Sequence, residues 1–437
     1  HARINSIDVT SAEALPGVVA VVTRADFPSL TPGSEAAFGT ITAREQYLSQ
    51  EVIARDKALF NGHAVAAVAA TSAAVAEKAL ALIEVDYEVL PFAMDPEEAT
   101  KPEATLLHGD LYTRSKDGMS ETPSNVAEHL EMGRGDVERG FAEADVVMDR
   151  TFRSQVVHHG YIETDVETAE ASSDGSVVVW ANTQATYAQR HDLAVVLDIP
   201  LSKIKVIPTE VGGAFGGKES VRVAALCVAL SRKAGLPVRI ALARDEVLRG
   251  TGPGNALIAT IKVGARRDGE ITAIQARVQF DAGAFPGAPL RSAIRRVFSH
   301  YRTPNLKIDA YDVVTNKPHV AAYRAPGATP TAFALESVID EVAEAVGLDP
   351  VSFRLKNVSR SGDPMPDGVR LSSVNFEELL NRVSSSPCWT QPLEGPNRGR
   401  GLALGMWTMP GGTTSCHLTL RACECIGVML LEILWGD

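Results

Sequence analysis

A glycine-rich segment near the middle of the chain restricts the possible folds more than any other feature. Residues 211–220 read VGGAFGGKES. The apolar run over 204–207 predicts a strand before this segment, and residues 221–234, followed by Gly235 and Pro237, predict a helix after it. A glycine loop that leads into a helix N-terminus predicts an anion site, because its free amides suit a phosphate or pyrophosphate. Such a loop can also serve packing alone.

The same segment resembles a nucleotide-binding P-loop only in part. The stretch from Gly212 to Lys218 fits the pattern GxxxxGK. A P-loop then needs a Ser or Thr hydroxyl for magnesium, but the next residue is Glu219. A carboxylate at this place would repel a triphosphate. A P-loop-like nucleotide-binding protein therefore remains a minor alternative.

The size and charge of the chain exclude several classes of protein. A chain of 437 residues exceeds what one hydrophobic core organises, so we expect roughly two to four structural units. The formal net charge is -12 and no Lys/Arg-rich run occurs, which predicts no nucleic-acid partner. No apolar run approaches the roughly 18 residues that span a bilayer, and residues 1–5 do not resemble a signal peptide. We expect no membrane association.

The cysteines do not form the pattern of a disulfide framework. Their number is odd and three of them crowd the last residues: Cys227, Cys388, Cys416, Cys423 and Cys425. A reducing compartment, the cytoplasm, is therefore expected, with the periplasm left open because the N-terminus is taken to be clipped. The pair in Cys423-Glu424-Cys425 has one intervening residue, too few for the CxxC of zinc or redox sites.

Short strands and helices alternate over the first hundred residues. Apolar runs predict strands over 17–22 and 64–69 and a helix from about Ser72. Strict apolar/polar alternation over 83–89 predicts a strand with one face in water, ended by Pro91. These elements predict a small α/β domain.

The remaining elements predict a larger second domain of mixed α/β or α+β class. A strand is expected over 146–152 and a tight hairpin turn at Asp174–Gly175. Thr329 and Pro330 predict the start of a helix that Gly347 ends, and Asp349–Pro350 predicts a short helix to Lys356. The apolar positions of the longer helix share one face, which is expected to be core: Leu335, Val338, Ile339, Val342 and Val346.

The last residues differ in composition from the rest of the chain. After about Leu420 the chain becomes rich in cysteine and apolar residues without helix punctuation. A frameshifted or cut gene would give this composition, and a short buried terminal helix is the alternative.

As a whole string, residues 212–219 resemble the GGxFGGKE signature of the molybdenum hydroxylases, the xanthine dehydrogenase/aldehyde oxidase family. Three further segments are similar to motifs of that family in the same order, namely HHGYIE at 158–163, WANTQ at 180–184 and AAYRAPG at 321–327. The resemblance covers roughly residues 1–415. It identifies the chain as a member of the family, a molybdopterin-binding large subunit truncated at both ends.

The resemblance also implies a division into domains. Residues 1–105 correspond to the family's hammerhead domain, clipped at its N-terminus. A linker is expected over 106–125, because the segment from Pro91 to about Asn125 carries four prolines and scattered polar residues. Residues 126–393 correspond to the first molybdopterin cofactor-binding domain. Residues 394–437 begin a second such domain, which is nearly absent. If the gene is frameshifted, the last of these residues are out of frame.

Roles around the metal follow from the resemblance. Gln184 is expected to hydrogen-bond an oxo ligand of molybdenum, which suits a neutral amide donor. Phe215 is expected to lie against the molybdenum centre together with its neighbouring backbone, and Arg324 to hold anionic oxygens there. The cofactor-binding backbone comprises Gly213, Ala214 and Gly216. The alternatives are a helix-start residue for Gln184, a core residue for Phe215 and a surface ion pair for Arg324.

Two residues are implied to face the substrate. Glu219 matches a position whose carboxyl group bonds ring nitrogens in purine-oxidising members, although it could instead complement the dipole of the following helix. Pro326 stands where purine enzymes carry a stacking aromatic, so no strict xanthine preference is expected. Ala325 replaces the cysteine of the copper-containing carbon monoxide dehydrogenases, and without a thiolate there is no copper ligand. The implied substrate is a small organic molecule oxidised at an aldehyde or N-heteroaromatic carbon with oxygen from water.

The implied cofactor is molybdopterin, in its cytosine dinucleotide form. Neither an iron–sulfur cysteine pattern nor a flavin-binding region occurs, so 2Fe-2S and FAD partner subunits are expected in a heterotrimer or its dimer. The general-base Glu is expected in the missing C-terminal part, which leaves no catalytic residue in this chain and predicts that it is inactive by itself. A non-catalytic scaffold relative or an inactive gene fragment is the alternative, against which Gln184, Phe215 and Arg324 argue.

Overall fold

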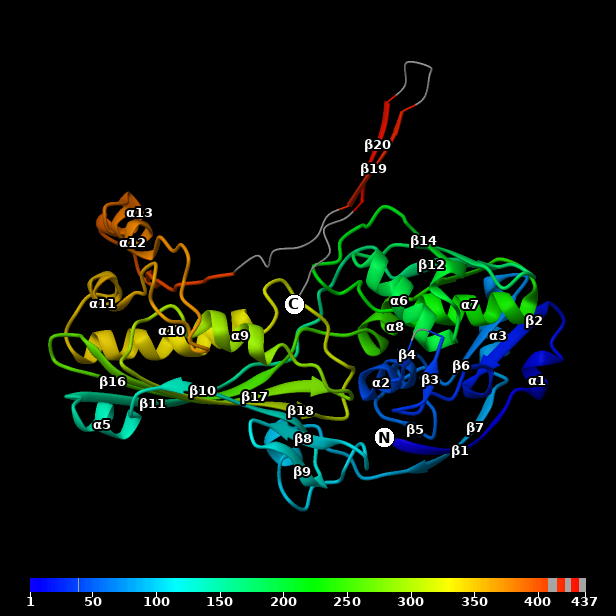
Figure 1. Ribbon diagram of the computed structural model, residues 1–437, viewed down its shortest axis with the longest axis horizontal. Helices are drawn as coiled ribbons and strands as arrows, with labels where there is room; N and C mark the ends of the chain where they lie inside the picture. The colour runs from blue at the N-terminus through cyan, green and yellow to red at the C-terminus, as the bar shows by residue number, and fades with distance from the viewer. Residues whose placement is uncertain (38, 408–414, 421–425, 432–437) are drawn as a thin grey trace. The chain divides into compact units, whose positions relative to one another are not determined.

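The computed structural model describes residues 1–37, 39–407, 415–420 and 426–431 (Figure 1). Two units are present, His1–Gly405 and Met406–Asp437, and each is described by itself. In the second unit, β19 (Ser415–Leu420) pairs antiparallel with β20 (Ile426–Leu431). The expectation of a terminal helix is therefore wrong over 426–431, while Cys423-Glu424-Cys425 lies outside the described residues.

The first unit contains a seven-stranded sheet in the order β11-β16-β17-β18-β10-β8-β9. Its strands are β8 (Tyr112–Ser115), β9 (Gly118–Pro123), β10 (Val126–Arg134), β11 (Val146–Arg153), β16 (Leu257–Ala265), β17 (Ile271–Gly283) and β18 (Asn305–Val314). Helix α10 (Ala328–Ala345) packs along β11 and β16 (Figure 1). The expected strand over 146–152 is confirmed as β11. The segment 106–125, expected to be a linker, instead forms the β8–β9 hairpin at one edge of this sheet.

A second sheet of four strands carries the glycine loop. Its order is β14-β13-β12-β15, with β12 (Val166–Ala171), β13 (Val177–Ala181), β14 (Ile204–Pro208) and β15 (Val238–Ala241). The hairpin at Asp174–Gly175 is confirmed, since β12 and β13 pair antiparallel and Gly175 has φ +84°. Helix α6 (Thr186–Leu197) connects β13 to the parallel strand β14.

The order strand, glycine loop and helix is also confirmed. Helix α7 (Arg222–Ala234) follows the loop and ends at Gly235, whose φ of +66° closes it in the left-handed conformation. Residues Val223 to Ser231 of α7 are all buried, so this helix runs through the core next to the four-stranded sheet. The loop before it is thus anchored at both ends in well-packed structure.

The N-terminal region packs against the same core. Strand β1 (Ala2–Asp8) lies between β5 (Lys57–Ala58) and β7 (Glu84–Val89), and β2 (Val18–Thr23) pairs with β6 (Ala66–Ala70). Helices α2 (Ala43–Val52) and α3 (Ala73–Leu80) complete it. The strands expected near 17–22, 64–69 and 83–89 are confirmed, as is the helix start, which the Ser72 hydroxyl caps. Side chains from β2, α2 and β6 share one hydrophobic cluster with α6 and α7.

Two local expectations differ from the structure. Tyr87 and Val89 are 44% and 81% exposed, so neither face of edge strand β7 is deeply buried, although its alternation predicted one wet face. Helix α10 begins at Ala328 with Gly327 as its N-cap, not at Thr329. The left-handed Gly327 (φ +69°) starts the helix early, and Pro330 then lies in the first turn, where its missing N–H costs nothing.

The remaining expectations for this region are confirmed. The predicted apolar face of α10 is buried at Leu335, Val338, Ile339 and Val342, and Gly347 follows its end with φ +75°. Helix α11 (Pro350–Asn357) has Asp349 as its N-cap, whose carboxylate accepts from the amides of Val351 and Ser352. None of the helices in the described ranges is both long and apolar enough to cross a membrane.

The other described elements are short. They are α1 (Thr10–Glu13), η1 (Arg24–Asp26), β3 (Glu35–Ala36), β4 (Gly39–Thr40), α4 (Pro96–Ala99), α5 (Val137–Ala142), η2 (Leu201–Lys203), α8 (Arg244–Gly250), α9 (Leu290–Val297), α12 (Phe376–Ser384) and α13 (Pro387–Thr390).

Candidate functional site

Three amides of the glycine loop are used inside the protein. Gly212 N–H donates to Glu163 Oε2 (2.7 Å) and Gly216 N–H to Gln184 Oε1 (2.9 Å). Gly217 N–H donates to the Ala214 carbonyl (2.8 Å). The expectation of free amides is therefore wrong for these three glycines. Because α7 begins only at Arg222, the expected helix N-terminus does not lie next to the glycines, and a P-loop cradle is not supported.

The loop of residues 321–327, called here the arginine loop, lies directly against the glycine loop. The Arg324 N–H donates to the Phe215 carbonyl at 3.0 Å. Gly216 has φ +102°, and a Cβ on it would lie 2.2 Å from the Ala322 carbonyl oxygen, so only glycine permits this approach. Phe215 (φ +54°) and Ala325 (φ +65°) also adopt left-handed backbone. Such conformations are costly without glycine and concentrate at functional sites.

The segment 158–163 contacts both loops. His159 Nε2 lies 2.7 Å from the Ala322 carbonyl oxygen, to which it donates. Lys218 is almost fully buried and donates to Glu163 Oε2 at 2.7 Å, with its Nζ 4.8 Å from the ring centre of Tyr161. Although burial acts in the opposite direction, Lys218 and the Gly212 amide hold the pKa of Glu163 below its usual value. All four segments singled out in the sequence thus meet.

Gln184 lies between β13 and α6 and is fixed by two hydrogen bonds. Its backbone N–H donates to the Lys218 carbonyl (2.9 Å), and its Oε1 accepts from Gly216 N–H. Because the side-chain oxygen is held by a donor, the amide NH₂ points elsewhere, and within the described residues it has no hydrogen-bond partner. Helix α6 begins at Thr186 with Ala185 as N-cap. The alternative of a helix-start role is therefore not supported.

Phe215 and Arg324 both present their side chains to solvent. Phe215 is 51% exposed, which contradicts the alternative of a core residue. Arg324 is exposed, and its guanidinium forms no ion pair with any residue that the structure describes, against the alternative of a surface ion pair. The guanidinium and the Gln184 NH₂ belong to residues hydrogen-bonded to Phe215 and Gly216, which are consecutive. Two residues that contact consecutive positions of the glycine loop thus carry unused donor groups, which suit an anionic, oxygen-rich ligand.

The two residues assigned to the substrate lie at the edges of these loops. Glu219 is exposed, yet desolvation by surrounding protein raises its pKa. It lies before the first turn of α7, where the helix dipole acts weakly. Pro326 is half-buried between Ala325 and Gly327, both with positive φ. Neither residue is hydrogen-bonded to Gln184 within the described part of the chain, so their substrate roles stay predictions.

Sequence reasoning missed a buried ionic group behind the loops, formed by Glu51, Arg222 and His319. Nothing in the sequence around Glu51 marks it, because its partners are distant along the chain. The only available signal was position, since His319 precedes the arginine loop and Arg222 follows Glu219.

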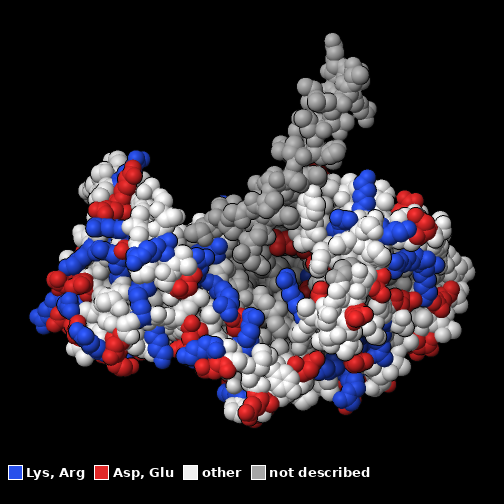
Figure 2. All heavy atoms as spheres, viewed as in Figure 1, with Lys and Arg blue, Asp and Glu red and all other residues white. Residues whose placement is uncertain are grey.

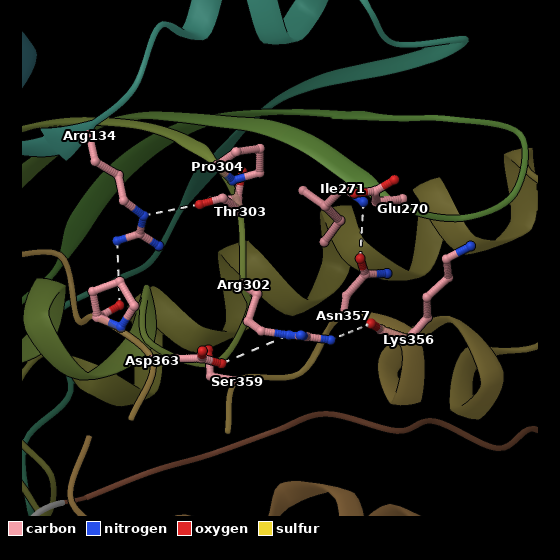
Figure 3. A pocket seen from close by; sticks show the side chains of 11 residues that line it. Arg134, Glu270, Ile271, Arg302, Thr303, Pro304, Lys356, Asn357, Ser359 and Asp363 are labelled. Carbon is pink, nitrogen blue, oxygen red and sulfur yellow. Dashed lines mark hydrogen bonds and ion pairs between the residues drawn. The ribbon is translucent and has the colours of Figure 1, made fainter. Parts of the chain in front are cut away.

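A separate cavity of about 410 Å³ lies at the C-terminal end of α11 (Figure 3). Its arginines bind backbone carbonyls. Arg134 Nε donates to the Thr303 carbonyl (3.0 Å), and Arg302 donates to those of Val358 (3.1 Å) and Lys356 (3.0 Å). No lining residue belongs to the four segments of the candidate site. This cavity is therefore a packing feature at a helix C-terminus. On the face shown in Figure 2, Lys and Arg are interspersed with Asp and Glu.

Two family models match the chain. Residues 119–358 match the molybdopterin cofactor-binding domain. Residues 1–91 match the aldehyde oxidase and xanthine dehydrogenase, a/b hammerhead domain.

Individual relatives agree with these matches. The chain is 32% identical over 419 residues to a probable xanthine dehydrogenase subunit of Bacillus subtilis, covering 94% of this chain and 53% of that protein. It is 30% identical over 387 residues to the nicotinate dehydrogenase large molybdopterin subunit of Eubacterium barkeri, covering 88% and 86%. Among solved structures, the aldehyde oxidoreductase of Desulfovibrio gigas superposes with a TM-score of 0.76 at 25% identity, covering 87% of this chain and 41% of that one. The chain thus spans about half the length of the first and third of these proteins.

Proposed function

The chain belongs to the xanthine dehydrogenase family of molybdopterin-binding large subunits, and we propose that its cofactor lies where the glycine loop meets the arginine loop. One observation carries this proposal. The Gly216 amide is bound to Gln184 Oε1 while the Phe215 carbonyl is bound to the Arg324 amide. This arrangement joins three segments that are distant along the chain and leaves the Gln184 NH₂ and the Arg324 guanidinium unused.

The residues present fit an anionic metal cofactor. When bound, the molybdenum centre would supply oxidation of a substrate carbon with oxygen derived from water. Gln184 would donate its NH₂ to an oxo ligand, because its other side-chain atom is already held. Arg324 would contribute a permanent positive charge beside anionic oxygens. The backbone of Gly213, Ala214 and Gly216 and the exposed ring of Phe215 would line the cofactor.

We further propose a cofactor and partners for the whole protein. The cofactor is molybdopterin cytosine dinucleotide, and electrons leave through 2Fe-2S and FAD subunits in a hetero-oligomer located in the cytoplasm. The general base is supplied by a residue outside the described part of the chain. The proposed domains are 1–105, 126–393 and 394–437, with residues 106–125 joining the first two as a hairpin of the seven-stranded sheet and not as a linker.

The proposed substrate is an aldehyde or an N-heteroaromatic compound. Ala325 offers no thiolate for copper, which disfavours carbon monoxide as substrate. Desolvation raises the pKa of Glu219, and its carboxyl group can hydrogen-bond a ring nitrogen. Nicotinate, in the name of one relative, and an aldehyde, in that of another, belong to these two classes.

Metal analysis combined with cofactor extraction tests the proposal. Molybdenum together with a pterin dinucleotide in the purified protein would support it. A folded protein that carries neither would favour the non-catalytic scaffold relative. Bound ATP would favour the nucleotide-binding alternative.

Gln184→Glu is expected to weaken the site without releasing the loop. The glutamate keeps an oxygen for the Gly216 N–H, so the loop stays anchored, but it replaces the NH₂ donor by a negative charge. We expect retention of the cofactor to fall by about 10- to 100-fold, as for changes in groups that orient a metal centre. Molybdenum per polypeptide and the pterin dinucleotide extracted from the purified protein measure this.

Gln275→Glu is the matched control. Gln275 lies on β17 and pairs across the sheet with Lys262 and Lys307, which tolerate a carboxylate. This variant should keep both readouts. An equal loss in the two variants would show that the added charge, and not the position of Gln184, is responsible.

A further inference from the structure

A single carboxylate of the N-terminal region connects the bases of both loops of the site. Glu51 lies on α2 and is 8% exposed. Its Oε2 accepts from His319 Nδ1 at 2.9 Å, and its Oε1 lies 3.7 Å from Arg222 Nη1. We infer that Glu51 is a positioning residue that holds the arginine loop and the glycine loop in their mutual register. What the two loops bind rests on the proposed function; that Glu51 holds them together does not.

Arg222 connects Glu51 to the end of the glycine loop. It is the first residue of α7 and follows Glu219, Ser220 and Val221 directly. Its Nε donates to Ser220 Oγ at 3.1 Å, and its Nη1 donates to the Gly250 carbonyl. The guanidinium thus joins the loop end to the last residue of α8. A shift of Arg222 would move Glu219 and the peptides before it.

His319 connects Glu51 to the base of the arginine loop. It lies two residues before Ala321, whose N–H donates to the Pro253 carbonyl at 2.8 Å. A Cβ on Gly252 would lie 2.5 Å from the His319 carbonyl oxygen, so the backbone here has no room to shift. The position of the His319 ring therefore sets where the arginine loop leaves the core.

The charge on Glu51 makes these contacts strong. Although burial acts to raise it, His319 and Arg222 lower the pKa of Glu51 to about 2. His63, which also faces this carboxylate, has its pKa lowered to about 4 by burial and is neutral at pH 7. Asp192 is a further charged neighbour and repels Glu51. An ionised carboxylate in this buried place attracts the Arg222 guanidinium and accepts the hydrogen bond from His319 more strongly than it would in water.

Helix α2 itself does not need Glu51. Thr42 and Glu45 form a capping box at its N-terminus, with Thr42 N–H donating to Glu45 Oε2 (2.6 Å) and Glu45 N–H to Thr42 Oγ1 (3.2 Å). Val52 at its end is fully buried in the shared core. The buried acid thus serves the two loops rather than its own helix.

Amide hydrogen exchange in the Glu51→Gln variant tests the inference. Glutamine has the same shape but carries no charge. We expect exchange in peptides that cover 212–222 and 319–327 to become faster on the order of tenfold, because the variant loses the ion pair with Arg222 and the charge of the acceptor that His319 contacts. Glu51→Asp keeps the charge on a shorter stem and should restore part of the protection. Exchange is measured on the purified protein, both as isolated and after removal of bound metal with a chelator.

Glu45→Gln is the control, since it makes the same change on the same helix. It weakens the capping box and should leave exchange in both loops unchanged. Equal loop exchange in the Glu51→Gln and Glu45→Gln variants would overturn the inference. If the wild-type protein holds no molybdenum while the loops still loosen in Glu51→Gln, the proposed function fails and the positioning role stands. If molybdenum is present and the loops do not respond, the positioning role fails alone.

Discussion

Replacing Gly216 by alanine is expected to separate the two loops of the site and to abolish retention of the cofactor. Gly216 has φ +102°, and an added Cβ would lie 2.2 Å from the Ala322 carbonyl oxygen and 2.7 Å from its carbon. Backbone atoms cannot rotate away as a flexible side chain can, so the arginine loop must shift. Left-handed strain and overpacking together cost about 2–5 kcal/mol.

The displacement has a specific consequence for the site. Moving Ala322 away from Gly216 would break the hydrogen bond from the Arg324 N–H to the Phe215 carbonyl and would shift Arg324 away from the glycine loop. Molybdenum per polypeptide and thermal unfolding of the purified variant measure the two parts of the effect. We expect molybdenum to be lost even in the fraction that remains folded.

Gly175→Ala separates the clash from the backbone strain. Gly175 also has positive φ, at +84°, but nothing lies within 4 Å of its added Cβ. This variant should lose about 1–2 kcal/mol from strain alone and should keep its molybdenum. Retention of molybdenum by Gly216→Ala at wild-type level would contradict the proposed place of the cofactor.

Local patterns were sufficient to predict the elements that carry the site. Apolar runs marked β14 and α7, and Gly235 marked the end of the helix, since these signals depend only on neighbouring residues. The glycine loop itself shows where such reasoning fails. Its amides were expected to be free, but Glu163 and Gln184 accept those of Gly212 and Gly216, and neither partner can be predicted from the loop sequence.

Contacts between distant segments could be predicted only from the family resemblance. Gly216 and Ala322 are more than a hundred residues apart, and no periodicity indicates that their backbones touch. The resemblance brought together Gln184, Phe215 and Arg324, which the structure joins by hydrogen bonds. It did not extend to Glu51, because that residue lies in a different region and outside every motif. The start of α10 was misplaced for a local reason, since glycine as N-cap gives a weaker sequence signal than Thr329.

The second large effect is expected from Glu167, a buried acid next to the end of the glycine loop, and concerns the stability of the protein. Glu167 on β12 is 5% exposed, and its Oε1 accepts from Gln189 Nε2 at 2.9 Å. Its Oε2 and the Gln189 Oε1 have no partner among the described residues. If the carboxyl group carries a proton on Oε2, that oxygen becomes a hydrogen-bond donor and no longer lacks a donor of its own. Burial raises the pKa of Glu167 to about 8, so the neutral acid is the stable form at pH 7.

This raised pKa makes the stability of the protein depend on pH. Between about 4.5 and 8 the folded state keeps the proton that the unfolded chain releases, so the free energy of unfolding decreases as the pH rises. The decrease is about 4–5 kcal/mol over the whole window, at roughly 1.4 kcal/mol for each pH unit. Above about pH 8 both states are ionised and this contribution no longer changes.

Glu167→Gln should remove this dependence, because an amide NH₂ takes the place of the protonated oxygen and is never ionised. At pH 5 we expect the free energy of unfolding of the variant to be similar to that of the wild type. At pH 8 it should be higher than that of the wild type by several kcal/mol. Denaturant titration at each pH measures both. Glu170→Gln, on the exposed side of the same strand, removes one negative charge without touching the pair. Because Gln189 also donates to the Ser220 carbonyl, ionisation of Glu167 would disturb the end of the glycine loop as well. A difference between variant and wild type that is equal at pH 5 and pH 8 would show that Glu167 is not held in its protonated form.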